Sequence, residues 1–329
     1  MEPRCAGLRR RGAQVAIANA VRHAGEGSVA GIDIGGTKIT VGIVNEAGAI
    51  LVRADASISV EDGPKRALAD IVEILNRQVQ QTGIVLAGIG IGCTGPADPI
   101  TGELGDVNTL PGWVGWNPVA DLSNVFGVSA ALENDADAAA LGEARWGVGR
   151  GKSSLIGITV GTGIGAGIIL NGEVYRGADG SHPEIGHHIV EPSGPLCTCG
   201  AYGCWESLAS GPALEQWYTE HNLDEVRSGK DICDLARSGN AGAQSAVNRM
   251  AKYLGLGISN VVSMFMPEVI ALSGGVMQNS DLFLDRIRAV VLKNSRLVPA
   301  ARCEIVVSSL GSDAGLIGAA QVWRSRFER

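Results

Sequence analysis

Residues 29–44 read VAGIDIGGTKITVGIV, and this stretch decides the fold. Two mainly apolar runs flank the turn Gly35-Gly36-Thr37-Lys38, which predicts a strand, a glycine turn and a second strand. The glycines let the backbone approach an anion closely, and Thr37 and Lys38 can donate to its oxygens. An isolated Gly-Gly pair is more often an ordinary hairpin turn. The preceding Asp33, which can hold Mg²⁺ through water, makes an anion-binding turn the more specific interpretation.

The same pattern recurs in residues 155–170, LIGITVGTGIGAGIIL. Aligning Gly157 with Gly31 gives an offset of 126 residues (157 − 31). A repeat of this length predicts two similar lobes, because solenoid repeats run at about 20–50 residues. The second glycine turn, Gly161-Thr162-Gly163, and the first could hold one polyphosphate between them.

Apolar periodicity predicts the remaining helices and strands. Strands are expected at residues 51–59, 85–91 and 268–272, and helices at residues 65–80, 243–265, 281–292 and 314–326. We expect an α/β protein with an N-terminal lobe at residues 29–142 and a C-terminal lobe at residues 143–329, whose last helix could pack back on the first lobe. Residues 1–28 are expected to be a disordered or weakly helical leader, since polar residues interrupt any apolar core of a secretory signal.

Composition limits the classes of partner. The chain has 329 residues, long enough for two domains, and its 34 acidic and 27 basic residues give a net charge of −7, which argues against nucleic acid. The uncharged, glycine-rich run at residues 155–170 is shorter than the roughly 20 apolar residues that span a bilayer. Forty-seven glycines and 4% aromatic residues fit a small, polar ligand held by main-chain N–H groups. We expect no nucleic-acid or membrane partner.

Glu133-Asn134-Asp135 follows an apolar run and precedes an alanine-rich stretch. This position is the carboxyl end of a strand and the start of a helix, where open α/β sheets bind ligands. Two interpretations remain open. Asn134 or Asp135 caps the helix, or Asp135 accepts the proton of an attacking hydroxyl during phosphoryl transfer.

Three of the seven cysteines, Cys197, Cys199 and Cys204, crowd together shortly after His187. One His and three Cys suffice for a closed tetrahedral zinc site, which predicts a structural zinc. His188 could replace His187 as the ligand. A disulfide with a spare thiol is the alternative, but Cys-x-Cys spacing is awkward for bridging, and the pattern points to the cytoplasm, a reducing compartment.

Three further candidates carry weaker signals. Glu184 and His187 would share one face of a helical turn, and although a lone Glu is usually solvated, their place in a loop held by metal favours a directional role in a ligand pocket. Asn108 precedes a Pro-Gly turn and is more often a simple turn residue. Gly274 and Gly275 follow a predicted strand and suit a close approach to an adenosine.

With these residues identified, the chain resembles the ROK family of sugar kinases and sugar-responsive repressors, within the actin/hexokinase-like ATPase superfamily. The resemblance covers residues 29–322 in order. Its most specific motifs are DIGGTK (33–38), END (133–135), EIGH (184–187) and CTCGAYGCWE (197–206).

The resemblance implies a two-lobed actin/hexokinase-like (ribonuclease H-like) fold with an internal duplication, a structural zinc loop, and ATP and sugar in a cleft. It implies Asp135 as the catalytic base and favours His187 over His188 as a zinc ligand. The implied sugar-binding residues are Asn108, Asn134, Asp135, Glu184, His187 and Glu206. The implied nucleotide-binding residues are Gly161, Thr162, Gly163, Gly274 and Gly275, to which the first turn adds Asp33, Gly35, Gly36, Thr37 and Lys38. The implied zinc ligands are His187, Cys197, Cys199 and Cys204.

The implied activity is ATP- and Mg²⁺-dependent phosphorylation of a hexose at its 6-hydroxyl, with glucose expected. Kinases for N-acetylmannosamine, N-acetylglucosamine and fructose share the scaffold and remain alternatives. A non-catalytic sugar sensor is the alternative from another class. Asp135 argues against it, as does the short stretch of residues 1–28, where family repressors carry a winged helix-turn-helix. The resemblance also implies a homodimer or homotetramer.

Overall fold

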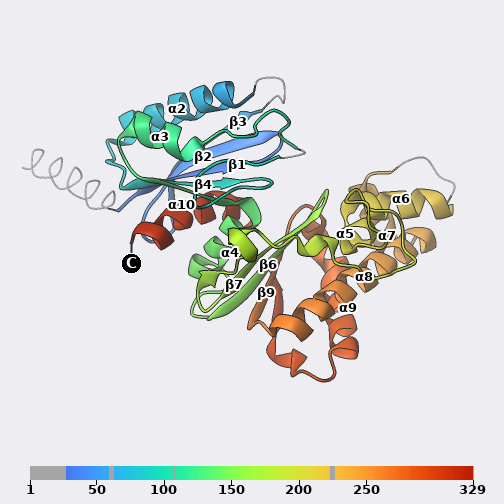
Figure 1. Ribbon diagram of the computed structural model, residues 1–329. Helices are drawn as coiled ribbons and strands as arrows, with labels where there is room; N and C mark the ends of the chain where they lie inside the picture. The colour runs from blue at the N-terminus through green and yellow to red at the C-terminus, as the bar shows by residue number, and fades with distance from the viewer. Residues whose placement is uncertain (1–26, 59–62, 107–108, 223–226, 329) are drawn as a thin grey trace, which may run out of the picture. The chain divides into compact units, whose positions relative to one another are not determined.

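A computed structural model describes residues 27–58, 63–106, 109–222 and 227–328 (Figure 1). Asn108 and nearly all of the predicted leader, residues 1–26, lie outside the described residues. The chain divides into two compact units. The first comprises Met1–Asp135 and Gly315–Arg329, and the second comprises Ala136–Ala314.

The first unit contains a five-stranded sheet in the order β3-β2-β1-β4-β5. Its strands are β1 (Val29–Ile34), β2 (Lys38–Val44), β3 (Ile50–Ser57), β4 (Gly88–Cys93) and β5 (Ala130–Asn134). β1, β2 and β3 pair antiparallel, whereas β4 and β5 run parallel to β1. The predicted first hairpin is therefore confirmed. The strand predicted at residues 85–91 begins three residues later, at Gly88. Its pairing with β1 runs from Gly88 to Cys93, and Val85 is exposed.

Helices cover both faces of this sheet (Figure 1). α2 (Gly63–Thr82) buries an apolar stripe, Ala67, Ile71 and Leu75, in the same core cluster as the apolar face of β1. α3 (Pro118–Phe126) begins at Asn117, whose side chain accepts a hydrogen bond from the Ala120 N–H, as an N-cap does. α10 (Ala314–Phe327) lies on the opposite face.

Glycine explains how closely α10 approaches the sheet. Gly31, Gly42 and Gly90 are neighbours across β2, β1 and β4. A Cβ at Gly31 would overlap the carbonyl oxygen of Leu316, and one at Gly90 would overlap that of Ala319. Glycines on this face therefore let the helix backbone rest directly on the strands.

The second unit repeats the first. Its sheet has the order β10-β9-β6-β7-β8, with β6, β7 and β8 antiparallel and β9 and β10 parallel to β6. The strands are β6 (Ser154–Val160), β7 (Ile164–Leu170), β8 (Glu173–Val174), β9 (Val269–Ser273) and β10 (Glu304–Val307). Gly157 pairs with Gly167, as Gly31 pairs with Gly42. This equivalence confirms the predicted internal duplication.

α8 (Ala241–Phe265) is the central helix of the second unit and contacts four others. These are α5 (Trp205–Ala209), α6 (Gly211–Asn222), α7 (Gly229–Arg237) and α9 (Ser280–Asn294). Short 3₁₀ turns are η2 (Ala178–Gly180), η3 (Ile185–His187), η4 (Val276–Asn279), η5 (Ala300–Arg302) and η6 (Gly311–Asp313). In the described part of the chain, no helix has both the length and the apolar character needed to cross a membrane.

α4 (Asp135–Trp146) is the counterpart of α10. It follows β5 of the first sheet but packs on the glycine face of the second, where a Cβ at Gly167 would overlap the Ala136 carbonyl oxygen. α10 follows β10 of the second sheet and packs on the first. Residues 136–142 consequently group with the second unit. The predicted boundary between the two lobes, after residue 142, stays a prediction.

Candidate active site

The first glycine turn is closed by a hydrogen bond from the Gly35 N–H to the Lys38 carbonyl oxygen, at 2.9 Å. Thr37 and Lys38 are exposed beyond it. Thr109 lies against the turn, because a Cβ on Gly36 would be 3.1 Å from the Thr109 Cβ. The segment that follows Asn108 therefore lies beside the predicted anion-binding turn.

Two carboxylates lie at the same edge of the first sheet. Asp33 is at the carboxyl end of β1, and Asp135 follows β5. Burial raises the pKa of Asp33 to about 6, and the charge of Asp135 adds to this, while Lys38 and Arg53 oppose it. Burial and the charges of Asp135 and Asp33 also raise the pKa of the Cys93 thiol, at the end of β4. Three adjacent parallel strands thus bring these groups together, as expected at the carboxyl edge of such a sheet.

Asn134 is buried and its amide nitrogen donates to the Gly95 carbonyl oxygen at 3.3 Å. The hydrogen bond joins the end of β5 to the loop that follows β4. This loop, Thr94-Gly95-Pro96, was not among the predicted site segments. A Gly-Pro pair directly after a buried parallel strand is the signal that could have found it.

The second glycine turn has a neighbour that the sequence did not predict. The Gly161 N–H donates to the Gly163 carbonyl oxygen at 2.9 Å and closes the turn. Glu206 accepts a hydrogen bond from the Ile164 N–H at 2.9 Å, and a Cβ at Gly163 would be 2.5 Å from the same carboxylate oxygen. Glu206, predicted to bind sugar, therefore also holds the predicted nucleotide-binding turn.

Gly274 lies against the same end of the second sheet. Its φ is +93°, and a Cβ would overlap the Val160 carbonyl oxygen at the end of β6, so this position requires glycine. A Cβ on the neighbouring Gly275 would meet only open space. The predicted nucleotide-binding glycines of the second unit thus gather at the adjacent ends of β6 and β9.

The segment that carries Glu184 rests on the start of β7. A Cβ at Gly186 would overlap the Ile164 carbonyl oxygen, so η3 contacts the strand directly. Glu184 itself is exposed. The predicted sugar-binding segment therefore contacts Ile164, the first residue of β7, which directly follows the second glycine turn.

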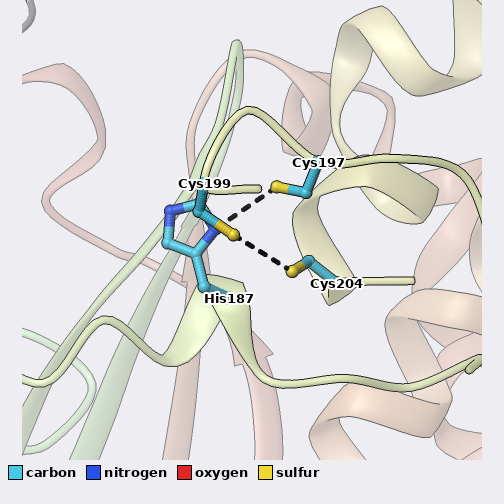
Figure 2. Close-up of side chains that lie close together, drawn as sticks. All are labelled: His187, Cys197, Cys199 and Cys204. Carbon is cyan, nitrogen blue, oxygen red and sulfur yellow. Dashed lines mark hydrogen bonds between the residues drawn. The ribbon is translucent and has the colours of Figure 1, made fainter. Parts of the chain in front are cut away.

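Figure 2 shows the imidazole of His187 facing the three cysteine sulfurs. The four potential ligand atoms all lie within 4.8 Å of one another. The Cys199 and Cys204 sulfurs are 3.5 Å apart, as are the Cys197 sulfur and His187 Nδ1. A disulfide needs about 2.05 Å between its sulfurs. Zn–S bonds of about 2.3 Å in a tetrahedron separate the sulfurs by about 3.8 Å, so the donor set fits zinc.

His188 points elsewhere. Its Nδ1 contacts the Ile185 carbonyl oxygen, and its ring packs on Trp205 with centroids 5.3 Å apart. Of the two histidines that the spacing left open, His187 is the one that lies with the cysteines, and its role as a ligand stays a prediction.

One further pair of polar residues was not predicted from the sequence. His182 Nδ1 lies 2.8 Å from a carboxylate oxygen of Asp137, and the Asp137 side chain is 1% exposed. Burial raises the pKa of Asp137, while the hydrogen bond and charge of His182 oppose that rise. Both residues flank predicted site residues, Glu184 and Asp135, but neither belongs to a motif that the sequence singled out.

The predicted site residues that the structure describes thus form two sets. The first unit holds Asp33, Gly35, Gly36, Thr37, Lys38, Asn134 and Asp135. The second unit holds Gly161, Thr162, Gly163, Glu184, His187, Cys197, Cys199, Cys204, Glu206, Gly274 and Gly275.

These features define a class of protein with a duplicated α/β fold, a glycine hairpin in each half and carboxylates at strand ends. The chain belongs to the ROK family, whose model matches residues 29–326.

Relatives match over nearly the whole chain. It is 33% identical over 313 residues to a glucokinase of Thermotoga maritima, covering 90% of this chain and 97% of that protein. A ROK hexokinase structure from Thermus thermophilus matches with a TM-score of 0.80 and 32% identity, covering 92% of this chain and 100% of the other. A ROK glucokinase from Streptomyces griseus, solved with glucose and AMPPNP, matches with a TM-score of 0.74 and 32% identity, covering 90% and 99%.

Regulators of the same family also match. A xylose repressor of Caldicellulosiruptor bescii is 32% identical over 311 residues, which cover 89% of this chain and 77% of the repressor.

Proposed function

We propose that this protein is an ATP-dependent hexose kinase that phosphorylates glucose at the 6-hydroxyl. The observation that carries the proposal is the pair Asp33 and Asp135 at the carboxyl edge of the first sheet, beside an exposed glycine turn. Similarity to glucokinases along nearly the full chain supports the same activity.

Asp135 would act as the general base. It begins α4, where the helix dipole favours the ionised carboxylate that a base requires. Accepting the proton of the sugar 6-hydroxyl would raise the nucleophilicity of that oxygen toward the terminal phosphoryl group of ATP. Asn108, Asn134, Glu184, His187 and Glu206 are the proposed residues that orient the sugar.

Asp33 would bind Mg²⁺ through water, and the fit is electrostatic. Two neighbouring carboxylates oppose each other's ionisation, and a divalent cation relieves that repulsion. When bound, Mg²⁺ supplies charge neutralisation for the phosphates. The two glycine turns, with Thr37, Lys38 and Thr162, would donate hydrogen bonds to the phosphate oxygens. Gly274 and Gly275 would line the adenosine.

The zinc proposed for His187, Cys197, Cys199 and Cys204 is structural, because four protein ligands leave no position for water or substrate. His187 turns Nδ1 toward the Cys197 sulfur, which leaves Nε2 as the nitrogen for a sugar hydroxyl. One side chain can therefore serve both proposed roles. The Cys-x-Cys spacing of the proposed zinc ligands supports a reducing compartment, and the proposed location is the cytoplasm.

A sugar-responsive regulator is the second candidate, favoured by the similarity to xylose repressors. Such a regulator would bind sugar without turning over ATP. ADP formation therefore separates the two functions.

The test is a coupled assay of ADP release from ATP and Mg²⁺ with and without glucose. We expect release that depends on glucose, and we expect Asp135→Asn to lower kcat by at least about 100-fold, the lower end for loss of a general base. The variant should retain its thermal stability and its glucose affinity by calorimetry. If Asp135→Asn turns over at a near wild-type rate, Asp135 acts only as a helix cap. If the wild-type protein releases no ADP with any hexose, the result favours the regulator.

A further inference from the structure

A buried hydrogen bond joins the segment that carries Glu184 to helix α4. His182 lies two residues before Glu184, and Asp137 lies two residues after Asp135 in the first turn of α4. Their side chains meet at 2.8 Å, with 12% exposure for His182 and 1% for Asp137. A hydrogen bond so well shielded from water is strong, and breaking it leaves a buried carboxylate short of a partner.

Helix α4 is a fixed support for this contact. On one side its first turn rests on β7 at Gly167, where no side chain would fit. At its other end, buried Glu143 accepts hydrogen bonds from the Val148 and Leu310 N–H groups, at 3.0 and 2.8 Å, and from the Ser308 hydroxyl. A segment tied to α4 is therefore tied to the second sheet.

The segment itself has little regular structure to hold it. Between β8 and α5 it contains two three-residue 3₁₀ turns, η2 and η3, and Asp179 inside η2 has a left-handed φ of 55°. Gly186 against Ile164 and the cysteine cluster anchor its later part. The His182 contact lies ahead of both anchors and so supports the stretch just before Glu184.

We propose that His182 and Asp137 are a positioning pair, which orders the segment before Glu184 against α4 and so holds the Glu184 carboxylate in place for the sugar. The inference rests on the proposed function, since Glu184 is there a sugar-binding residue. Neither His182 nor Asp137 needs to touch the substrate. The pair should therefore affect sugar affinity more than the chemical step or ATP affinity.

The first experiment compares His182→Ala, Asp137→Ala and the double variant by steady-state kinetics. We expect KM for glucose to rise about tenfold in each single variant, in the range that loss of one charge-assisted hydrogen bond allows, while kcat and KM for ATP change less than about threefold. Because the two side chains act as a unit, the double variant should resemble either single one. Additive effects on KM for glucose would overturn the pairing.

Asp137→Asn is the conservative variant. Its amide oxygen can accept from His182 Nδ1–H, so KM for glucose should stay within about threefold of wild type. His221→Ala is the matched control, since His221 bonds a backbone carbonyl and stacks on Trp217 in α6. It should change neither KM.

Hydrogen exchange gives a readout that does not depend on catalysis. His182→Ala should speed exchange in peptides covering residues 178–187 without speeding exchange in α9. Unchanged exchange there, or faster exchange throughout the second unit, would overturn the positioning role even if the variant folds poorly. Failure of the proposed function is a separate result, namely wild-type protein that releases no ADP with glucose.

Discussion

Ionisation of the Asp33 carboxyl lowers the free energy of unfolding. Its pKa rises from an ordinary 3.8 to about 6 through burial and the nearby charge of Asp135. Between these two pH values the folded state binds more protons than the unfolded state. Stability therefore falls as pH rises through this window, and the full penalty applies above about pH 6.

We therefore expect Asp33→Asn to stabilise the protein at pH 8 and to have little effect at pH 4. The shift corresponds to at most about 3 kcal/mol in the free energy of unfolding. Thermal unfolding of wild type and variant without divalent cations, from pH 4 to 8, measures the difference. A stability gain that does not depend on pH would mean that desolvation of the charge is not its origin. The same substitution should abolish kinase activity, since Asp33 is proposed to bind Mg²⁺.

At the scale of single residues, the sequence predicted which residues belong to the candidate site, but it did not predict which side chains contact each other. Asp33, Asp135 and the three clustered cysteines stand in short motifs whose chemistry is visible from spacing. The pairing of His182 with Asp137 joins residues 45 positions apart. Only the packing of α4 on β7 brings them together, so local sequence held no signal for it.

The segment that carries the proposed zinc ligands also carries three of the six proposed sugar-binding residues, Glu184, His187 and Glu206. Cys204 is followed by Trp205, whose indole donates to the Tyr253 carbonyl oxygen at 2.9 Å and lies on α8 where Gly257 leaves room. Glu206 comes next and holds the second glycine turn through Ile164. A metal that fixes Cys204 would therefore stabilise both the core contact and the turn.

We expect the purified protein to hold about one zinc per chain. Cys199→Ser should lower zinc content, lower the melting temperature and raise KM for glucose, because binding energy at a structural zinc is folding energy. Metal analysis, thermal unfolding and kinetics on one preparation measure all three. Cys303→Ala, at a buried cysteine outside the cluster, is the control and should keep its zinc. Full activity and stability of a verified zinc-free preparation would contradict this expectation.

Long elements with a clear period were predictable, and short ones were not. The glycine hairpins, α2, α8, α9 and α10 follow apolar patterns in the sequence. Helices α5, α6 and α7 were not predicted, since short helices depend on tertiary packing for their stability. The side chains of Trp205 and Tyr218 supply that packing, because both are fully buried in the hydrophobic core of the second unit.

At the scale of the whole molecule, the duplication explains why α4 and α10 exist as a pair. Each follows the fifth strand of one sheet and covers the glycine face of the other sheet. The repeat of 126 residues between Gly31 and Gly157 predicted the two sheets. It could not predict this exchange of helices, because glycine spacing shows where a helix can rest but not which helix does so.

Sugar choice also belongs to this scale, because the proposed sugar-binding residues come from segments far apart in the sequence. Glu184 is exposed and its carboxylate would accept hydrogen bonds from the hydroxyls at C1 and C2. Each charge-assisted bond contributes about 1.5–3 kcal/mol, so glucose should exceed 2-deoxyglucose by at least about 10-fold in kcat/KM. N-acetylmannosamine should be a poor substrate, because its N-acetyl group adds bulk at C2 against a loop that zinc would hold in place. Measuring kcat/KM for glucose, 2-deoxyglucose, mannose, fructose and N-acetylmannosamine under one set of conditions decides between these sugars. A preference for N-acetylmannosamine over glucose would change the proposed substrate and leave the proposed kinase activity intact.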